Sequence, residues 1–276
     1  MNAIIMTERL GGIPIVQRHP SLVVENLCVR FGSVVAIETM SLTVGRGEFV
    51  SLLGPSGCGK STLLKAIAGL VKPAAGRIAW SDAAPADPGR AEPARTGAIG
   101  FMFQKPLLLP WRTTLDNVLL PIEIERGRDG VDPSERRKAQ HMLDLVRLGD
   151  FAAAYPHQLS GGMAQRAALA RALMCDPDIL LLDEPFGALD ELTRDVLNEE
   201  LIRIWRNRQT RLATVLMVTH SIPEAVTMSD RVVVLTKRPA RLVEDVAVPW
   251  PRPRAPEDAD TAAIIRHIRA LVRSGQ

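Results

Sequence analysis

The sequence predicts an α/β fold in which buried strands and helices surround a glycine-rich loop. Residues 49–53 form a short apolar run bounded by glycine, which is typical of a buried strand. After Lys60 the apolar residues return at helical spacing, and Gly69 ends that pattern. A second apolar run, residues 178–182, suits a parallel strand buried on both faces. These three observations predict an open α/β sheet.

Length, composition and charge are those of an ordinary globular protein. With 276 residues, 46% of them hydrophobic, the chain can bury a sizeable core as one large domain or with an inserted subdomain. The net charge of +3 comes without a lysine- or arginine-rich block, so we expect no nucleic-acid partner. No stretch approaches the roughly 18 apolar residues of a membrane span, so we expect the chain to stay in the cytosol.

The cysteines do not form a recognisable metal or disulfide pattern. Cys28, Cys58 and Cys175 are scattered singly, so reduced thiols are expected. Cys58 lies in the glycine-rich loop beside Lys60, where a helix N-terminus and a cation favour the thiolate and predict a reactive thiol. A small residue that fills a tight loop is the equally acceptable interpretation.

The N-terminal fifth of the chain is expected to contain an extension followed by strands. Residues 1–20 carry an apolar piece interrupted by Glu8 and Arg9, which predicts a loose extension and not a signal peptide. Residues 22–50 alternate as strands and turns with no helical pattern between them. Phe31 ends the first strand pair, and its local pattern favours a core aromatic.

The glycine-rich loop matches the pattern G-x-x-x-x-G-K-[ST]. Gly54, Gly59, Lys60 and Ser61 occupy its fixed positions. Glycines that carry a strand into a helix expose backbone N–H groups where the helix dipole also favours an anion. The lysine adds a positive charge for the outer phosphates, and the serine adds a hydroxyl for Mg²⁺. This stretch therefore predicts a site for a nucleoside triphosphate.

The middle of the chain is expected to hold two short strands and a helical insertion. Residues 76–80 suit a strand, and residues 81–95 form a proline- and alanine-rich surface loop. A further strand at residues 98–103 ends at Gln104, whose amide is either a simple cap or part of a site. Residues 115–162 carry apolar residues at helical spacing in two segments, which predicts the helical insertion.

A second helix start has the ingredients of an anion site. Ser160 is expected to N-cap an alanine-rich helix that runs to about residue 174, and Gly161 and Gly162 follow it. Glycines and a hydroxyl at a helix N-terminus can bind an anion, but no lysine completes the site. The stretch is therefore either an ordinary capped helix or half of a shared site.

Two carboxylates follow the buried strand at residues 178–182. Asp183 and Glu184 lie where ligands bind in open α/β sheets, and adjacent buried charges need cations or solvent. Mg²⁺ beside the phosphates would stabilise Asp183, while Glu184 could orient and deprotonate a water molecule. A further strand at residues 214–218 leads to His220, which we expect on the same edge.

The C-terminal part predicts one more strand and a terminal helix. The strand is expected at residues 231–235, and a linker rich in proline and arginine begins near residue 250. The helix that follows has Ile264, Ile265, Ile268, Leu271 and Val272 on one face. We expect that face to pack on the core.

The order of these elements resembles the ATP-binding subunit of ABC transporters over residues 22–248. GPSGCGKST resembles the Walker A loop, FMFQ the Q-loop, LSGGM the signature, ILLLDEP Walker B, GALD the D-loop and VTH the switch histidine. The resemblance implies a P-loop NTPase (RecA-like) core with an antiparallel β subdomain and an inserted α-helical subdomain. We place the ATPase domain at residues 21–250, its helical subdomain at about 105–165, and the C-terminal linker and helix at 251–276.

The resemblance also implies which residues bind nucleotide and metal. The ATP-binding set would comprise the loop, the second helix start, one aromatic and one acidic residue: Phe31, Gly54, Pro55, Ser56, Gly57, Cys58, Gly59, Lys60, Ser61, Thr62, Ser160, Gly161, Gly162 and Asp190. Phe31 would stack on adenine, which reverses its local interpretation as a core residue. Ser61 and Gln104 would reach Mg²⁺, and Asp183 would hold it through water.

Three residues would act in catalysis, and a second copy would complete the site. Glu184 would be the catalytic base, His220 would contact the γ-phosphate, and Gln104 would act beside them. The half-site at residues 160–162 would close over the Walker A loop of a second chain in a head-to-tail homodimer, with Asp190 at the neighbouring subunit. Met163 and Ala164 after it depart from the commonest signature.

Within the family, three segments look most like the nitrate/sulfonate/taurine importer group, including members that handle pyrimidine or thiamine precursors. They are PWRTTLDNVLLPIE, DEPFGALDELTR and THSIPEAVTMSDRVVVLTKRP. The resemblance implies an integral membrane permease whose coupling helix enters a groove near Gln104. It also implies an indirect periplasmic or surface solute-binding protein, and a peripheral location at the cytoplasmic face of the inner membrane.

Two other functions are disfavoured by the sequence. A soluble ABC ATPase acting on nucleic acid or ribosomes would carry long coiled-coil insertions or tandem cassettes, whereas only residues 105–159 separate Gln104 from Ser160 here. A regulatory nucleotide-binding module without turnover is disfavoured because Glu184 and His220 are both present.

Overall fold

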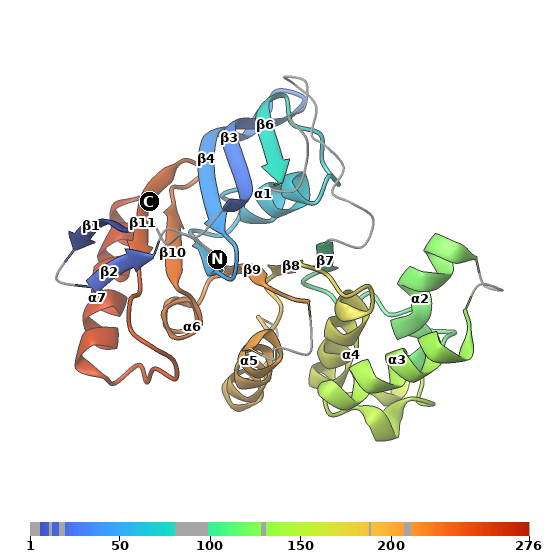
Figure 1. Cartoon of the computed structure of the whole chain (residues 1–276). Helices are drawn as coiled ribbons and strands as arrows, with labels where there is room; N and C mark the ends of the chain where they lie inside the picture. Colours follow the sequence, from blue (N-terminus) through green and yellow to red (C-terminus); the bar gives the residue numbers. More distant parts are fainter. Residues whose placement is uncertain are drawn as a thin grey trace. The chain divides into compact units, whose positions relative to one another are not determined.

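The computed structural model consists of two compact units (Figure 1). It describes residues 6–10, 13–16, 20–80, 99–127, 131–187, 189–206 and 211–275. The first unit comprises Met1–Ala94 and Ala213–Gln276, and the second comprises Arg95–Leu212. The surface loop expected at residues 81–95 lies outside the described residues. Among the described helices, none has the length and hydropathy needed to span a membrane.

An antiparallel sheet forms one part of the first unit. Its strand order is β4-β3-β6, with β3 at Pro20–Phe31, β4 at Val34–Gly45 and β6 at Ala75–Trp80. Along β3, Leu22, Val24, Leu27 and Val29 are buried while Glu25 and Arg30 are exposed, so one face packs on the core. The strands expected before residue 50 and near residue 80 are confirmed.

A mixed sheet forms the other part of the first unit. β5 (Phe49–Leu53) lies between β9 (Thr214–Thr219) and β10 (Arg231–Leu235) and is parallel to both, while β11 (Leu242–Ala247) pairs antiparallel with β10. Every residue of β5 and β9 is buried. The continuous apolar runs therefore mark strands covered on both faces.

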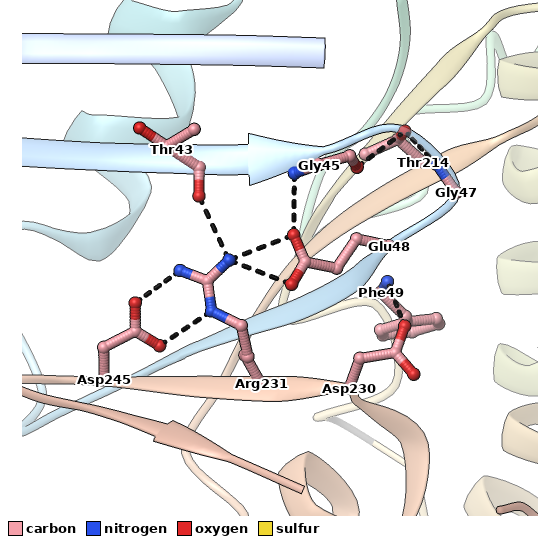
Figure 2. A network of polar contacts seen from close by, with 9 residues as sticks. All are labelled: Thr43, Gly45, Gly47, Glu48, Phe49, Thr214, Asp230, Arg231 and Asp245. Atoms are coloured by element: carbon pink, nitrogen blue, oxygen red, sulfur yellow. Dashed lines mark hydrogen bonds and ion pairs between the residues drawn. The ribbon is translucent and has the colours of Figure 1, made fainter. Parts of the chain in front are cut away.

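A largely buried guanidinium ties this sheet to the turn between β4 and β5 (Figure 2). Arg231 Nη1 donates to the two carboxylate oxygens of Glu48, at 2.9 and 3.0 Å, and to the carbonyl of Thr43 at 3.1 Å. Its Nε donates to Asp245 at 2.9 Å. Burial alone would lower the pKa of Arg231, but the hydrogen bonds and charges of Asp245 and Glu48 outweigh burial and raise it.

Replacing Arg231 by leucine should destabilise the first unit. The carboxylate of Glu48 would stay buried without its cation, so we expect the free energy of unfolding to fall by about 3 kcal/mol. Arg241→Leu is the matched control, since its ion pair with Glu38 is exposed and should contribute no more than about 1 kcal/mol. Urea unfolding measures both variants, and equal losses would contradict this account.

Three of the described helices belong to the first unit. α1 (Lys60–Ile67) follows β5, and Gly69 just beyond it has φ 74°, as expected of a glycine that ends a helix. α6 spans Ile222–Met228, and α7 spans Ala259–Ser274. Ile265 and Ile268 of α7 are buried against residues of β5, α6, β10 and β11, and Ile264, Leu271 and Val272 pack around them. The predicted amphipathic packing of the terminal helix is confirmed.

Four elements differ from the sequence-based expectation. The predicted loose extension contains two antiparallel strands, β1 (Met6–Leu10) and β2 (Ile13–Val16), so that prediction was wrong for these residues. The Gly-Gly pair between the two runs is the hairpin signal that could have revealed them. β11 is an edge strand with charged residues in its sequence. α6 has only seven residues, which is too few to show a repeating helical pattern of apolar residues. Neither element was predicted.

Among its described residues, the second unit combines two parallel strands with four α-helices. β7 (Ile99–Met102) pairs with β8 (Ile179–Asp183). The helices α2 (Thr114–Arg126), α3 (Pro133–Leu145) and α4 (Gly161–Leu173) pack on one another, and α5 spans Glu191–Arg206 (Figure 1). The expected helical segments are present, while the domain boundaries at residues 20, 105, 165 and 250 stay predictions.

Side-chain caps begin the two helices of the insertion. The hydroxyl of Thr113 accepts from the backbone N–H of Asp116 at 3.1 Å at the start of α2. Asp132 starts α3 by accepting from the N–H groups of Ser134 and Glu135, at 2.6 and 3.1 Å. The hydrogen bond from the Ser134 hydroxyl, followed by these backbone bonds, lowers the pKa of Asp132. The turns that start both helices are therefore specified locally.

Candidate functional site

The loop between β5 and α1 requires its glycines. Gly57 has φ 70° and Gly59 has φ 123°, in the region that side-chain-bearing residues rarely adopt. A Cβ on Gly59 would approach the carbonyl oxygen of Ala36 to 2.9 Å, and one on Gly54 would approach that of Leu235 to 3.0 Å. The backbone of the loop is thus held close to neighbouring strands, and larger residues do not fit.

Lys60 places its ammonium inside the loop. Its Nζ donates to the carbonyls of Gly54 and Pro55, at 2.8 and 2.9 Å, and the residue is only 4% exposed. Ser56 and Gly57 form the exposed tip of the loop. The arrangement concentrates positive charge beside backbone amides at the start of a helix, as a phosphate site needs.

The burial of Cys58 favours its interpretation as a small residue that fills a tight loop over its interpretation as a reactive thiol. The Sγ atom lies 4.0 Å from Lys60 Nζ, and the residue is 1% exposed. A thiol enclosed in this way is poorly accessible to reagents, so the space-filling interpretation is the better one. Cys28, Cys58 and Cys175 are all free thiols.

Strand register brings His220 to the edge of the loop. Leu53 of β5 pairs with Thr219 of β9, so Gly54 and His220 follow at the same carboxyl edge of the sheet. His220 is exposed there. The Thr219 hydroxyl donates to the buried carboxylate of Glu224 and accepts from the N–H of Ser221 at 3.0 Å. These bonds hold the chain on both sides of the histidine.

Phe31 is exposed, so its local interpretation as a core residue was wrong. It is the last residue of β3 and is 52% exposed. A large aromatic side chain left open to solvent at a strand end is available for stacking on a planar ligand. Its contact with adenine stays a prediction.

Strand register in the second unit brings Gln104 to Glu184. Met102 of β7 pairs with Leu182 of β8, and each polar residue follows two positions later. The amide Nε2 of Gln104 donates to Glu184 Oε2 at 2.8 Å. The amide at this strand exit is therefore more than a cap, because it orients a carboxylate.

The two carboxylates at the end of β8 differ in their surroundings. Asp183 is buried as the last residue of the strand, whereas Glu184 is partly exposed. Glu184 has φ 47°, a left-handed conformation that costs a residue other than glycine about 1 kcal/mol. Strained backbone conformations of this kind cluster at functional sites, and the Glu184 side chain here accepts the hydrogen bond from Gln104.

Ser160 caps α4 as predicted. Its hydroxyl accepts from the N–H of Met163 at 3.3 Å, so the unusual side chain at residue 163 leaves this contact unaffected. Ser160 and Gly161 are exposed. A Cβ on Gly162 would approach Thr193 Cγ2 to 3.0 Å, so this helix start lies against the first turn of α5.

Asp190 begins α5 next to that helix start. Its carboxylate accepts from the N–H of Thr193 at 3.0 Å, and this bond is the main reason why the pKa of Asp190 is lowered. Because the pKa of Asp190 is lower in the folded state than in the unfolded chain, its contribution to folding stability is present above the ordinary aspartate pKa and is lost as the pH falls through the lowered pKa. A charged cap on an exposed loop is available to a neighbouring molecule.

The predicted site residues fall into two sets, one in each unit. Phe31, residues 54–62 and His220 belong to the first unit, and the remainder belong to the second. The proposed Mg²⁺ ligands draw on both sets. Their hydroxyl, amide and carboxylate oxygens are the donors that Mg²⁺ prefers, so the residues fit the metal. Within the described ranges, no three His, Cys, Asp or Glu side chains form a metal cluster by themselves.

Three polar residues that support the site were not predicted from the sequence. Thr219 and Glu224 hold the chain around His220, and Gln165 of α4 donates to the carbonyl of Gln104. All three are buried. A polar residue on an otherwise apolar helix face or strand is the signal that could have identified them.

Comparison with known proteins agrees with this geometry. The family model described as ABC transporter matches residues 37–187. An uncharacterized ABC transporter ATP-binding protein of Methanocaldococcus jannaschii is 45% identical over 238 residues, which is 84% of each chain. The aliphatic sulfonates import ATP-binding protein SsuB of Bacillus licheniformis is 42% identical, covering 86% of this chain and 85% of SsuB. The nitrate import ATP-binding protein NrtD of Synechococcus elongatus is 43% identical, covering 82% and 79%.

Solved structures show the same fold. The dimeric structure of MJ0796, a bacterial ABC transporter cassette, has a TM-score of 0.68 at 33% identity and covers 82% of this chain and 98% of that one. A post-hydrolysis state of MJ0796 bound to ADP and Pi has a TM-score of 0.67 at 32% identity, with the same coverage. The predicted fold class is therefore confirmed. Because the family model spans more than half of the chain and relatives above 40% identity span most of it, the chain belongs to the ABC transporter family, as one of its ATP-binding proteins.

Proposed function

We propose that this chain hydrolyses ATP to power the import of a small solute through a separate membrane permease. The observation that carries the proposal is the meeting of the glycine loop, the buried Lys60 ammonium and His220 at one edge of the first unit's sheet. Such an edge offers backbone amides, a cation and an imidazole to the phosphates of a nucleotide. ATP hydrolysis is the activity of the ATP-binding proteins of ABC transporters.

Binding would use both ends of the nucleotide. The amides of residues 54–62 and the Lys60 ammonium would hold the phosphates, and Phe31 would stack on adenine. Ser61, Gln104 and Asp183 would hold Mg²⁺, with Asp183 acting through water. When bound, the ion neutralises charge on the β- and γ-phosphate oxygens.

Hydrolysis would depend on Glu184. Its carboxylate would take a proton from a water molecule while the water oxygen bonds to the γ-phosphorus and the bond to the β-phosphate oxygen breaks. Gln104 would orient the carboxylate through the hydrogen bond from its amide nitrogen, and its amide oxygen remains the donor for Mg²⁺. His220 would contact the γ-phosphate.

A second copy of the chain would complete each ATP site. The exposed start of α4, with Ser160, Gly161 and Gly162, offers a helix N-terminus for a phosphate but carries no lysine there. Asp190 would lie at the subunit boundary. MJ0796, which shares the fold, is dimeric in its solved structures. We therefore propose a head-to-tail homodimer that closes on two ATP molecules.

An exposed apolar surface of the second unit suits the permease. Leu107, Trp111 and Ile124 are exposed, with Trp111 at 72%, and the first two follow Gln104 in sequence. Exposed apolar side chains that gather into one patch mark interaction surfaces, and we propose that these three residues form such a patch. We assign this surface to a coupling helix of the permease, and the chain to the cytoplasmic face of the membrane, with a solute-binding protein acting indirectly.

The solute is proposed from the relatives. Relatives above 40% identity are named as import ATP-binding proteins, for aliphatic sulfonates in one case and for nitrate in others. Both solutes are small oxyanions, and precursors of pyrimidine or thiamine remain within the proposed group.

Trp111→Asp tests the transport function. A charge on this surface should abolish co-purification with the permease and reduce solute uptake by at least about 10-fold, because charged residues are depleted from interface cores. ATP hydrolysis by the isolated chain should stay unchanged. Leu242→Asp, at an exposed position of β11, is the control and should retain uptake. Full uptake by the Trp111 variant would contradict the docking surface, and full uptake without the chain would contradict the function.

A further inference from the structure

Helix α4 holds the loop that follows β7 by three hydrogen bonds to main-chain carbonyls. Gln165 Nε2 donates to the carbonyl of Gln104 at 3.0 Å. Arg171 donates to the carbonyls of Pro106 and Leu107, at 2.6 and 2.8 Å. Leu107 has φ 49°, an unfavourable conformation for leucine, so the loop is held in a specific shape. Helix α4, which begins at the LSGGM segment, therefore also fixes the backbone of the loop that carries Gln104, the residue that contacts Glu184.

Gln165 is an unusual side chain for its position. It lies in an alanine-rich helix and is only 3% exposed. Its amide oxygen has no hydrogen-bond partner within the described part of the chain. A buried polar atom left in this state typically costs about 1–3 kcal/mol, so stability gives no reason for the amide here. We attribute the presence of glutamine at this position to the hydrogen bond that its Nε2 donates to the carbonyl of Gln104.

The hydrogen bonds continue from Gln165 to the carboxylate. Gln104 is exposed, so little packing fixes its side chain, and the position of its backbone decides where its amide points. That amide donates to Glu184 at 2.8 Å. Resting on the proposed role of Glu184 as the base, we infer that Gln165 is a positioning residue for ATP hydrolysis, which acts on Glu184 through Gln104.

Gln165→Met tests this inference in the full-length chain. Methionine has similar length and fills the buried space but has no N–H donor. We expect kcat to fall about 10-fold, within the roughly 10²-fold that a 1 Å misplacement near a reacting group can cost. The KM for ATP should change less than about twofold, because no contact with the nucleotide is removed. Gln140→Met is the matched control, since Gln140 donates to the carbonyl of Gly149 at 3.2 Å in the same unit, and its kcat should match the wild type.

A double-mutant cycle separates positioning from packing. In a Gln104→Ala background the link to Glu184 is already broken, so Gln165→Met should cause little further loss of kcat. The same fold-loss in both backgrounds, or a wild-type kcat for Gln165→Met alone, would overturn the inference. If the methionine variant does not fold, Gln165→Glu replaces the donor with an acceptor in the same cycle. The Glu184→Gln variant separates this inference from the proposed function on which it rests. Full ATPase activity of that variant would refute the role of Glu184 as the base, whatever the result for Gln165.

Discussion

The Glu184→Gln variant should bind ATP normally, but its rate of phosphate release should fall by about 10³-fold, which is within the range that a general base contributes to a reaction rate. Glutamine has nearly the same shape and can still accept a hydrogen bond from Gln104, so the site should stay intact. It has no basic oxygen to take the proton from water. Single-turnover phosphate release measures the loss, and calorimetric titration measures ATP binding.

An exposed carboxylate on α5 provides the control for this variant. Glu199→Gln removes the same charge from an exposed position of the same unit and should hydrolyse ATP at the wild-type rate. Turnover by the Glu184 variant at a rate like that of this control would remove Glu184 from the mechanism. Loss of ATP binding along with turnover would show that Glu184 acts in binding and not as a base.

Lys60→Ala should weaken ATP binding by roughly 10²-fold. A charge-assisted hydrogen bond to a phosphate contributes about 3 kcal/mol, and each 1.4 kcal/mol is tenfold in affinity. The ammonium lies buried within the loop, and the shortened side chain would offer no cation to the phosphates. Lys65→Ala, in the last turn of the same helix, is the matched control and should bind ATP as the wild type does. Equal affinity of the two variants would contradict the assignment of the loop.

Much of the fold could be predicted because its signals are local. The buried strands β5 and β8 appear as continuous apolar runs, and the second is displaced by one residue from its predicted place. The Ser160 cap and the end of α1 near Gly69 follow from residue types that favour helix ends. Residues close in sequence decide these features, so one sequence suffices.

The site residues could be proposed one by one from the sequence, and their roles stay predictions, but the contacts between them could not be proposed in this way. The pairing of Met102 with Leu182 decides that Gln104 meets Glu184, and register depends on contacts between distant segments. The support from Gln165 depends on the same long-range packing. Phe31 shows the reverse case, since its apolar character suggested the core although the strand end leaves it exposed.

Sharing of each ATP site between two copies is tested most directly by mixing two inactive variants. Gly161→Asp should fold, because a Cβ there meets only Leu189 at 3.8 Å and an acidic residue suits the first turn of α4. Its charge would face the phosphates and repel them, while Lys60→Ala disables the loop. A mixed dimer then carries both lesions in one site and leaves the other intact.

The ATPase rate of an equal mixture of these two variants is the decisive measurement. Random pairing makes half of the dimers mixed, each with one of two sites intact, so the mixture should recover up to about a quarter of the wild-type rate. A mixture no faster than the mean of the two variants measured alone would contradict the shared site.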